Sequence, residues 1–161
     1  MSGISVIPRQ TLLEVLDYNP DTGEFRWKAQ ISRKSKIGGR AGSLSKHLGY
    51  RILRIGGIQI YEHRAAWFYV YGRMPLGDID HINGDKSDNR ICNLREATRA
   101  KNMLNLHKPN KNNKTGFLGV HKVGNSYASR ITVAGQTKHL GCFKTPEEAH
   151  KRYMEYKNIL L

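Results

Sequence analysis

Residues 78–105 read DIDHINGDKSDNRICNLREATRAKNMLN, and this stretch decides the expected fold of the central part of the chain. Its apolar residues predict a short strand over 79–82, and Asn-Gly-Asp at 83–85 predicts a turn. A second strand is predicted over 91–94, and Thr98 has the side chain of a helix N-cap. The expected order is therefore strand, loop, strand and helix.

This order and its polar residues resemble the ββα-metal motif of HNH endonucleases, in the HNN variant common in bacteriophage and intron-encoded enzymes. The similar stretch runs from about His63 to Asn105. In that family the first histidine is the general base, the residue before it binds metal, a middle asparagine orients the base, and a helical residue completes the metal site. The resemblance assigns these roles, in that order, to His81, Asp80, Asn93 and Asn102.

Hydrolysis of a phosphodiester agrees with these roles, because a water must be deprotonated and charge on the phosphate oxygens must be neutralised. An imidazole titrates near neutral pH, and a carbonyl such as that of Asn93 fixes the tautomer of the ring. Asp80 and Asn102 offer hard oxygen ligands, which favour Mg²⁺ or Mn²⁺ and make zinc an unexpected metal. Arg99, three residues before Asn102, would share its helix face and bind a phosphate.

Several neighbouring residues leave alternatives open. Asn105 is the main rival of Asn102 as the helical metal ligand. His63 could approach the site, although a helix-start or packing role is favoured. Asp85 and Asn89 are expected to cap backbone amides in the loop and not to bind metal.

The chain is strongly basic, with 27 Lys and Arg against 13 Asp and Glu among 161 residues and a formal net charge of +14. Such a chain gains most from a polyanion through the release of counterions. Double-stranded DNA is the expected partner, and RNA is less favoured because no aromatic stacking motif stands out. A membrane is set aside because no segment joins a strongly apolar face to a basic one.

The N-terminal residues lack the pattern of a signal peptide, which leads us to expect a cytoplasmic protein, in the host cell if a phage encodes it. The two cysteines, Cys92 and Cys142, form no Cys-x-x-Cys pair. Neither a zinc ribbon nor a disulfide framework is indicated, and both thiols are expected to be small buried side chains.

Residues 1–60 are expected to form a β-rich, basic region. A short helix is predicted over 11–17, a turn over 19–23 and a strand over 24–28. Gly56-Gly57 separates strands at 49–55 and 58–61, as a tight hairpin requires, and an apolar helix follows over 63–71. The basic segment 32–47 should be a loop, either merely solvated or resting against phosphates through Arg33, Lys34, Lys36 and Arg40.

The expected nuclease domain spans 61–106 and is followed by a linker at 107–115, which has no aliphatic or aromatic side chain able to build a core. Beyond it, strands are predicted over 120–123, 126–133 and 137–143. A capping box at 145–148 then starts a helix that should cover one sheet face. The overall expectation is an α+β fold, with 116–161 as a separate domain.

Residues 116–156 resemble the Apetala-two type of DNA-binding domain, through Gly119-Val120, 127–131 and 140–149. In that family the sheet face opposite the helix enters the major groove. Period-two alternation assigns to this face His121, Arg130, Thr132, Thr137 and His139. The same alternation turns toward the helix Ile131, Val133, Leu140 and Cys142. The target sequence does not transfer, because Arg130 and His139 stand where plant domains usually carry an acidic residue and a tryptophan.

Together these patterns predict a monomeric, homing-type endonuclease, with a single active site that nicks DNA first. Two alternatives stay open: a DNA-binding regulator that keeps an inactive HNH scaffold, and a broadly nonspecific nuclease.

Overall fold

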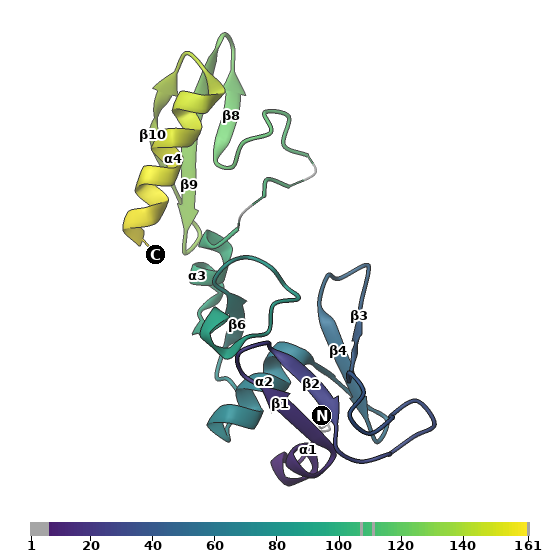
Figure 1. Ribbon diagram of the computed structural model, residues 1–161. Coiled ribbons are helices and arrows are strands. Elements are labelled where there is room, and N and C mark those ends of the chain that lie inside the picture. Colours follow the sequence, from purple (N-terminus) through teal and green to yellow (C-terminus); the bar gives the residue numbers. More distant parts are fainter. Residues whose placement is uncertain (1–6, 107, 111, 161) are drawn as a thin grey trace. The chain divides into compact units, whose positions relative to one another are not determined.

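The computed structural model describes residues 7–106, 108–110 and 112–160, which form four α-helices and several small sheets (Figure 1). The fold is therefore mixed α+β, as predicted. The chain divides into two compact units, one ending at Glu96 and one beginning at Ala97. We call them unit 1 and unit 2 and describe each by itself. Among the described helices, none has the length and apolar character needed to span a bilayer.

Unit 1 begins with helix α1 (Arg9–Val15), which runs directly into the antiparallel pair β1 (Leu16–Asn19) and β2 (Glu24–Trp27). The predicted helix over 11–17 is therefore displaced. Leu16 is fully buried and pairs with Trp27, so sheet pairing and burial override the local helix preference. The turn between the strands forms as predicted, with Asn19 Oδ1 accepting from the backbone of two turn residues.

The second sheet of unit 1 has the order β3 (Ser43–Leu44), β4 (Arg51–Ile55) and β5 (Ile58–Tyr61). The predicted hairpin is confirmed: Gly56 and Gly57 both have positive φ, which the tight turn needs. Helix α2 (Glu62–Tyr71) follows at once and ends at Gly72 in the left-handed conformation. The α2 face toward the core presents Ala65, Ala66 and Trp67 to the apolar side chains of α1, β1, β2 and β4.

The central stretch forms β6 (Asp78–His81) and β7 (Leu94–Ala97), which pair as a two-stranded sheet. The predicted second strand over 91–94 is wrong, because Ile91–Asn93 is a single 3-10 turn and β7 begins only at Leu94. The Asn93 amide donates to the Arg90 carbonyl at 2.9 Å, which closes this turn. The polar loop between β6 and the turn carries much of the candidate site.

Unit 2 contains α3 (Arg99–Leu104), the antiparallel meander β8 (Val120–Val123), β9 (Ser126–Val133) and β10 (Gln136–Phe143), and α4 (Pro146–Leu160). Thr98 caps α3 by accepting from the Lys101 amide, and Thr145 and Glu148 form the predicted capping box of α4. Leu104 of α3 joins Ile131 and Tyr153 in one apolar core. The predicted linker, of which residues 107 and 111 lie outside the described part, therefore falls within unit 2.

A β-bulge in β10 changes which residues share a sheet face. The register shifts between His139 and Gly141, so that Cys142 lies opposite Ala128 while His139 lies opposite Arg130. The extra residue reverses the alternation after the bulge. Cys142 is therefore exposed, with its Sγ 3.7 Å from His139 Nε2, and the prediction that it faces the helix is wrong. Cys92 is exposed as well, so neither thiol is the buried side chain that the sequence suggested.

Candidate active site

His81 ends β6 and lies in the interior of unit 1, with 4% of its surface exposed. Burial lowers the pKa of its imidazole, and this outweighs the hydrogen bond to Asn89 and the nearby carboxylates, which raise it. A lowered pKa keeps the ring neutral near pH 7. The neutral ring is the form that can accept a proton from water.

Asn89 holds the ring in one orientation. Its Oδ1 lies 3.1 Å from His81 Nε2, and its Nδ2 donates to Glu62 Oε2 at 3.2 Å. An ionised carboxylate only accepts, so the Asn89 amide presents its NH₂ to Glu62 and its oxygen to His81. The imidazole proton therefore belongs on Nε2 and the lone pair on Nδ1, which is the arrangement of a general base.

Asn93, predicted to orient the histidine, forms bonds that close the loop. Its Nδ2 donates to the Asp88 carbonyl at 2.8 Å and to Asn83 Oδ1 at 3.0 Å. Its Oδ1 accepts from the Asn83 amide at 3.0 Å. The carbonyl at Nε2 of the histidine comes instead from Asn89. Asn89 lies in the loop, where it was expected to cap backbone amides, and its spacing in the sequence gives no sign of a contact with His81.

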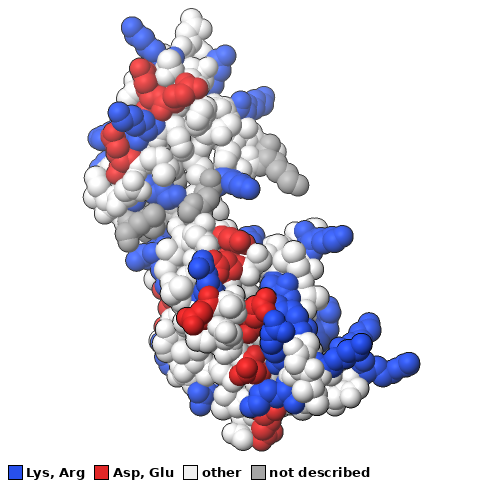
Figure 2. All heavy atoms as spheres, viewed as in Figure 1, with Lys and Arg blue, Asp and Glu red and all other residues white. Residues whose placement is uncertain are grey.

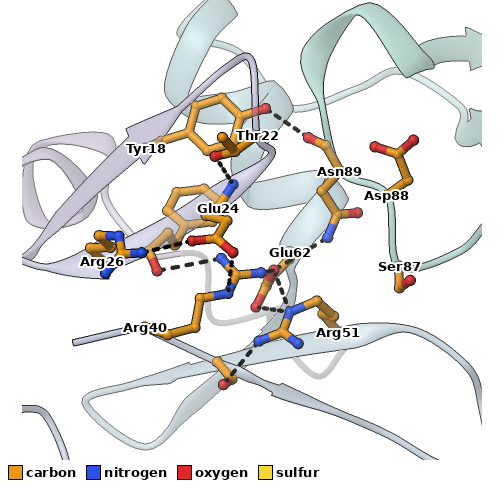
Figure 3. A network of polar contacts seen from close by, with 12 residues as sticks. Tyr18, Thr22, Glu24, Arg26, Arg40, Arg51, Glu62, Ser87, Asp88 and Asn89 are labelled. Atoms are coloured by element: carbon orange, nitrogen blue, oxygen red, sulfur yellow. Dashed lines mark hydrogen bonds and ion pairs between the residues drawn. The ribbon is translucent and has the colours of Figure 1, made fainter.

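Glu62 lies behind Asn89, at the first position of α2, with none of its surface exposed (Figure 3). Its carboxylate accepts from Arg51 Nε at 3.1 Å and from an Arg40 terminal nitrogen at 3.2 Å. Burial raises the pKa of Glu62, and the two guanidinium groups act against that rise. Sequence reasoning missed this residue; the available signal was a lone acid between two aromatic rings at the head of an apolar helix.

Arg40 consequently does not belong with the exposed basic loop in which it was predicted. Its guanidinium bonds Glu62 and lies 3.8 Å from Glu24, and a quarter of its side chain remains exposed (27%). Arg33, Lys34 and Lys36 are exposed, as a phosphate-binding loop requires. Figure 2 shows Lys and Arg side chains projecting from the surface of unit 1.

Asp80 precedes His81 on β6 and is 4% exposed. Its Oδ2 accepts from Arg95 Nε at 2.9 Å and lies 2.8 Å from a terminal nitrogen of the same guanidinium. Two nitrogens of one guanidinium thus converge on a single oxygen of Asp80 and hold the carboxylate in place. Among the described residues, no three His, Cys, Asp or Glu side chains gather into a metal cluster.

The donor set predicted for the metal fits a hard cation by its chemistry, because one carboxylate and one amide oxygen would leave further positions to water and phosphate. Asn102 lies on α3 with a half-buried side chain, whereas its rival Asn105 follows the helix and is buried (7% exposed). Asn102 is therefore the more accessible of the two.

His63 lies against the candidate base, with the two imidazole centroids 5.1 Å apart and the rings nearly perpendicular. It stacks on Tyr61 at 5.4 Å and contacts Tyr50. Burial lowers the pKa of His63 to about 3, so the ring is neutral over the physiological range. Its Nδ1 has no hydrogen-bond partner among the described residues. His63 therefore has the packing role that was favoured, and it also approaches the site, because its ring packs directly against His81.

In unit 2, the side chains predicted to contact DNA are all exposed on the sheet: His121, Arg130, Thr132, Thr137 and His139. Three of them, His121, Arg130 and Thr132, line a cavity of about 630 Å³ together with Arg99 of α3. The hydroxyl oxygens of Thr132 and Thr137 lie 2.9 Å apart across the two strands. Three of the five predicted DNA-contacting side chains thus line the same cavity as the predicted phosphate-binding arginine.

Comparison with known proteins identifies the central segment. Residues 61–104 match the family of the HNH endonuclease. The match begins at the start of α2 and ends in α3, and it includes His81, Asn89, Asn93 and Asn102. No curated protein matches the chain significantly, and no solved structure does. The matched segment supports a nuclease that acts on DNA and uses a divalent metal.

Proposed function

We propose that this protein is a homing-type DNA endonuclease in which His81 is the general base. The observation that carries the proposal is a buried histidine whose Nε2 lies 3.1 Å from an amide oxygen, within a segment that matches the HNH endonuclease. That arrangement leaves the basic lone pair on Nδ1, as proton abstraction from water requires.

The other side chains of the site would hold and neutralise the phosphate. Asp80, aligned by Arg95, and Asn102 would hold Mg²⁺ or Mn²⁺, and the cation would supply charge neutralisation at the phosphate oxygens. Arg99 would bind a phosphate oxygen through its planar guanidinium. Asn93 would keep the loop between β6 and β7 closed, so that His81 and Asp80 keep their positions.

The sheet of unit 2 would read the duplex, in the manner of the Apetala-two type of domain. Its exposed face offers donors to bases and phosphates, and Arg130 is the side chain best suited to a guanine or a phosphate. The loop residues Arg33, Lys34 and Lys36 would add contacts to the backbone of the DNA. One active site in a monomer would nick a single strand first.

The decisive experiment is a nicking assay on supercoiled plasmids carrying a random-sequence library, with Mg²⁺ supplied. We expect wild type to produce nicked circles and His81→Ala to lose about 10²- to 10⁴-fold in rate, the usual contribution of a general base. His47→Ala is the matched control, because His47 is exposed and outside the site. Binding without nicking by wild type would instead support the inactive regulator, and equal cutting at unrelated sites would support a nonspecific nuclease.

A further inference from the structure

Glu62 is a fully buried carboxylate that the proposed chemistry does not use. Taking such a group out of water is costly unless it is paired and hydrogen-bonded. Here Arg40 and Arg51 neutralise it, and the start of α2 adds a favourable helix dipole. Two arginines committed to one carboxylate keep it in its accepting, ionised form.

The third partner of Glu62 is the asparagine that holds the candidate base. Asn89 is 1% exposed and is anchored at three points: its Nδ2 on Glu62, its Oδ1 on His81, and its backbone carbonyl, which accepts from the Tyr18 hydroxyl at 2.7 Å. Burial raises the pKa of Tyr18, so the phenol stays protonated and donates. Because the backbone of Asn89 is held, its side-chain Oδ1 and Nδ2 can exchange positions only by rotation of the amide group about the Cβ–Cγ bond.

Two glycines make room for this arrangement. A Cβ at Gly42 would collide with Glu62 Oε1, and a Cβ at Gly23 would collide with the backbone of Asn89 and Arg90. Both glycines have positive φ, near +75° and +71°. The β1–β2 turn and the bend before β3 thus leave room for the asparagine and the carboxylate.

We propose that Glu62 is a positioning residue that acts through Asn89 to set the tautomer of His81. The ionised carboxylate accepts the Asn89 NH₂, which forces the Asn89 oxygen toward Nε2 and places the imidazole proton there. A neutral group in place of the carboxylate would let the amide rotate and donate to Nε2. The proton would then move to Nδ1, and the lone pair would lie on Nε2, facing Asn89. This inference deepens the proposed function and rests on it for its catalytic meaning.

The test reads the tautomer directly, by ¹⁵N NMR of the His81 ring in the full-length protein. We expect wild type to hold the proton on Nε2 and Glu62→Gln, which preserves shape, to populate the Nδ1-protonated tautomer. Glu24→Gln is the matched control, since Glu24 also lies near Arg40 but is partly exposed and forms none of the three bonds that anchor Asn89. An unchanged ring in Glu62→Gln would overturn the proposal.

Kinetics and a second variant separate this role from a merely structural one. Glu62→Gln should lower kcat for nicking by about 10²-fold or more, as a misplaced proton does, while the Kd for DNA stays the same. Glu62→Asp, which keeps the charge, should restore part of the rate. If Glu62→Gln fails to fold, Asn89→Ala removes the link while Glu62 keeps both arginines; kcat should then fall as for Glu62→Gln, and an unchanged kcat would refute the inference.

The outcomes also distinguish the two proposals. A tautomer shift in Glu62→Gln without nicking by wild type would uphold the positioning role of Glu62 and end the nuclease proposal. Nicking by wild type without any tautomer shift in the variants would support the nuclease proposal and refute the positioning role of Glu62.

Discussion

Arg51 in unit 1 and Arg130 in unit 2 are both arginines on strands, and they serve opposite purposes. Arg51 lies on β4 with 19% of its side chain exposed and bonds a carboxylate that has no exposed surface. Arg130 lies on β9, exposed, and lines a cavity on the sheet of unit 2. The positive charge of this chain is therefore of two kinds: part is paired with one buried acid inside unit 1, and part is exposed on unit 2, where we propose that it contacts DNA.

The largest difference between the buried and the exposed arginines should appear in the free energy of unfolding. Arg51→Met leaves the Glu62 carboxylate buried with one cation fewer, and we expect a loss of about 3 kcal/mol in the free energy of unfolding. Arg130→Met, a matched change on an exposed strand position, should cost less than about 0.5 kcal/mol. Urea unfolding of the two variants measures both values. Equal losses would mean that the buried cluster contributes no more than a surface residue.

Histidines extend the comparison to pH. Unfolded His63 binds a proton below about pH 6.5, whereas folded His63 binds one only near pH 3. The unfolded state therefore binds more protons between these values, and stability should fall with decreasing pH by up to about 1.4 kcal/mol per unit. His63→Phe should remove this part of the pH dependence, and His139→Phe, on the exposed sheet of unit 2, should not. Melting temperatures from pH 7 to 4 would show whether the slopes differ.

The smallest expected effect concerns DNA binding. Arg130→Ala should lower the slope of log Kd against log salt by about one, because one phosphate contact releases about one counterion. Arg40→Ala removes the same formal charge from a guanidinium already held by Glu62, and its slope should stay near that of wild type. Titrations of labelled duplex at several salt concentrations would compare them. A loss of slope at Arg40 would place that side chain on the DNA after all.

The elements that sequence reasoning predicted correctly are those with local causes. Gly56-Gly57 specifies its hairpin, Gly72 ends α2, and the Thr145–Glu148 pair starts α4. Each of these signals acts within a few residues, so no knowledge of the rest of the fold is needed.

The predictions that failed depended on distant partners. Leu16 lies outside the helix because it pairs with Trp27 in a sheet. Cys142 is exposed because the β-bulge between His139 and Gly141 turns the following residues to the opposite sheet face. The asparagine that contacts His81 is also bonded by Glu62 and Tyr18, which come from other elements. The sequence favoured Asn93 for the contact with His81 and gave Asn89 a loop-capping role, because the packing that brings Asn89 to the ring comes from residues distant in sequence.

The support that Tyr18 and the Gly23 turn give to Asn89 has a consequence for building chimeras. The segment that matches the HNH endonuclease starts at residue 61, yet the hydroxyl and the close turn that steady its loop come from the hairpin β1–β2, about forty residues upstream. A graft of 61–104 alone onto a foreign DNA-binding domain would carry His81 and Asn89 without the Tyr18 hydroxyl and the turn at Gly23. The smallest segment that could be transferred with this support therefore includes the β1–β2 hairpin.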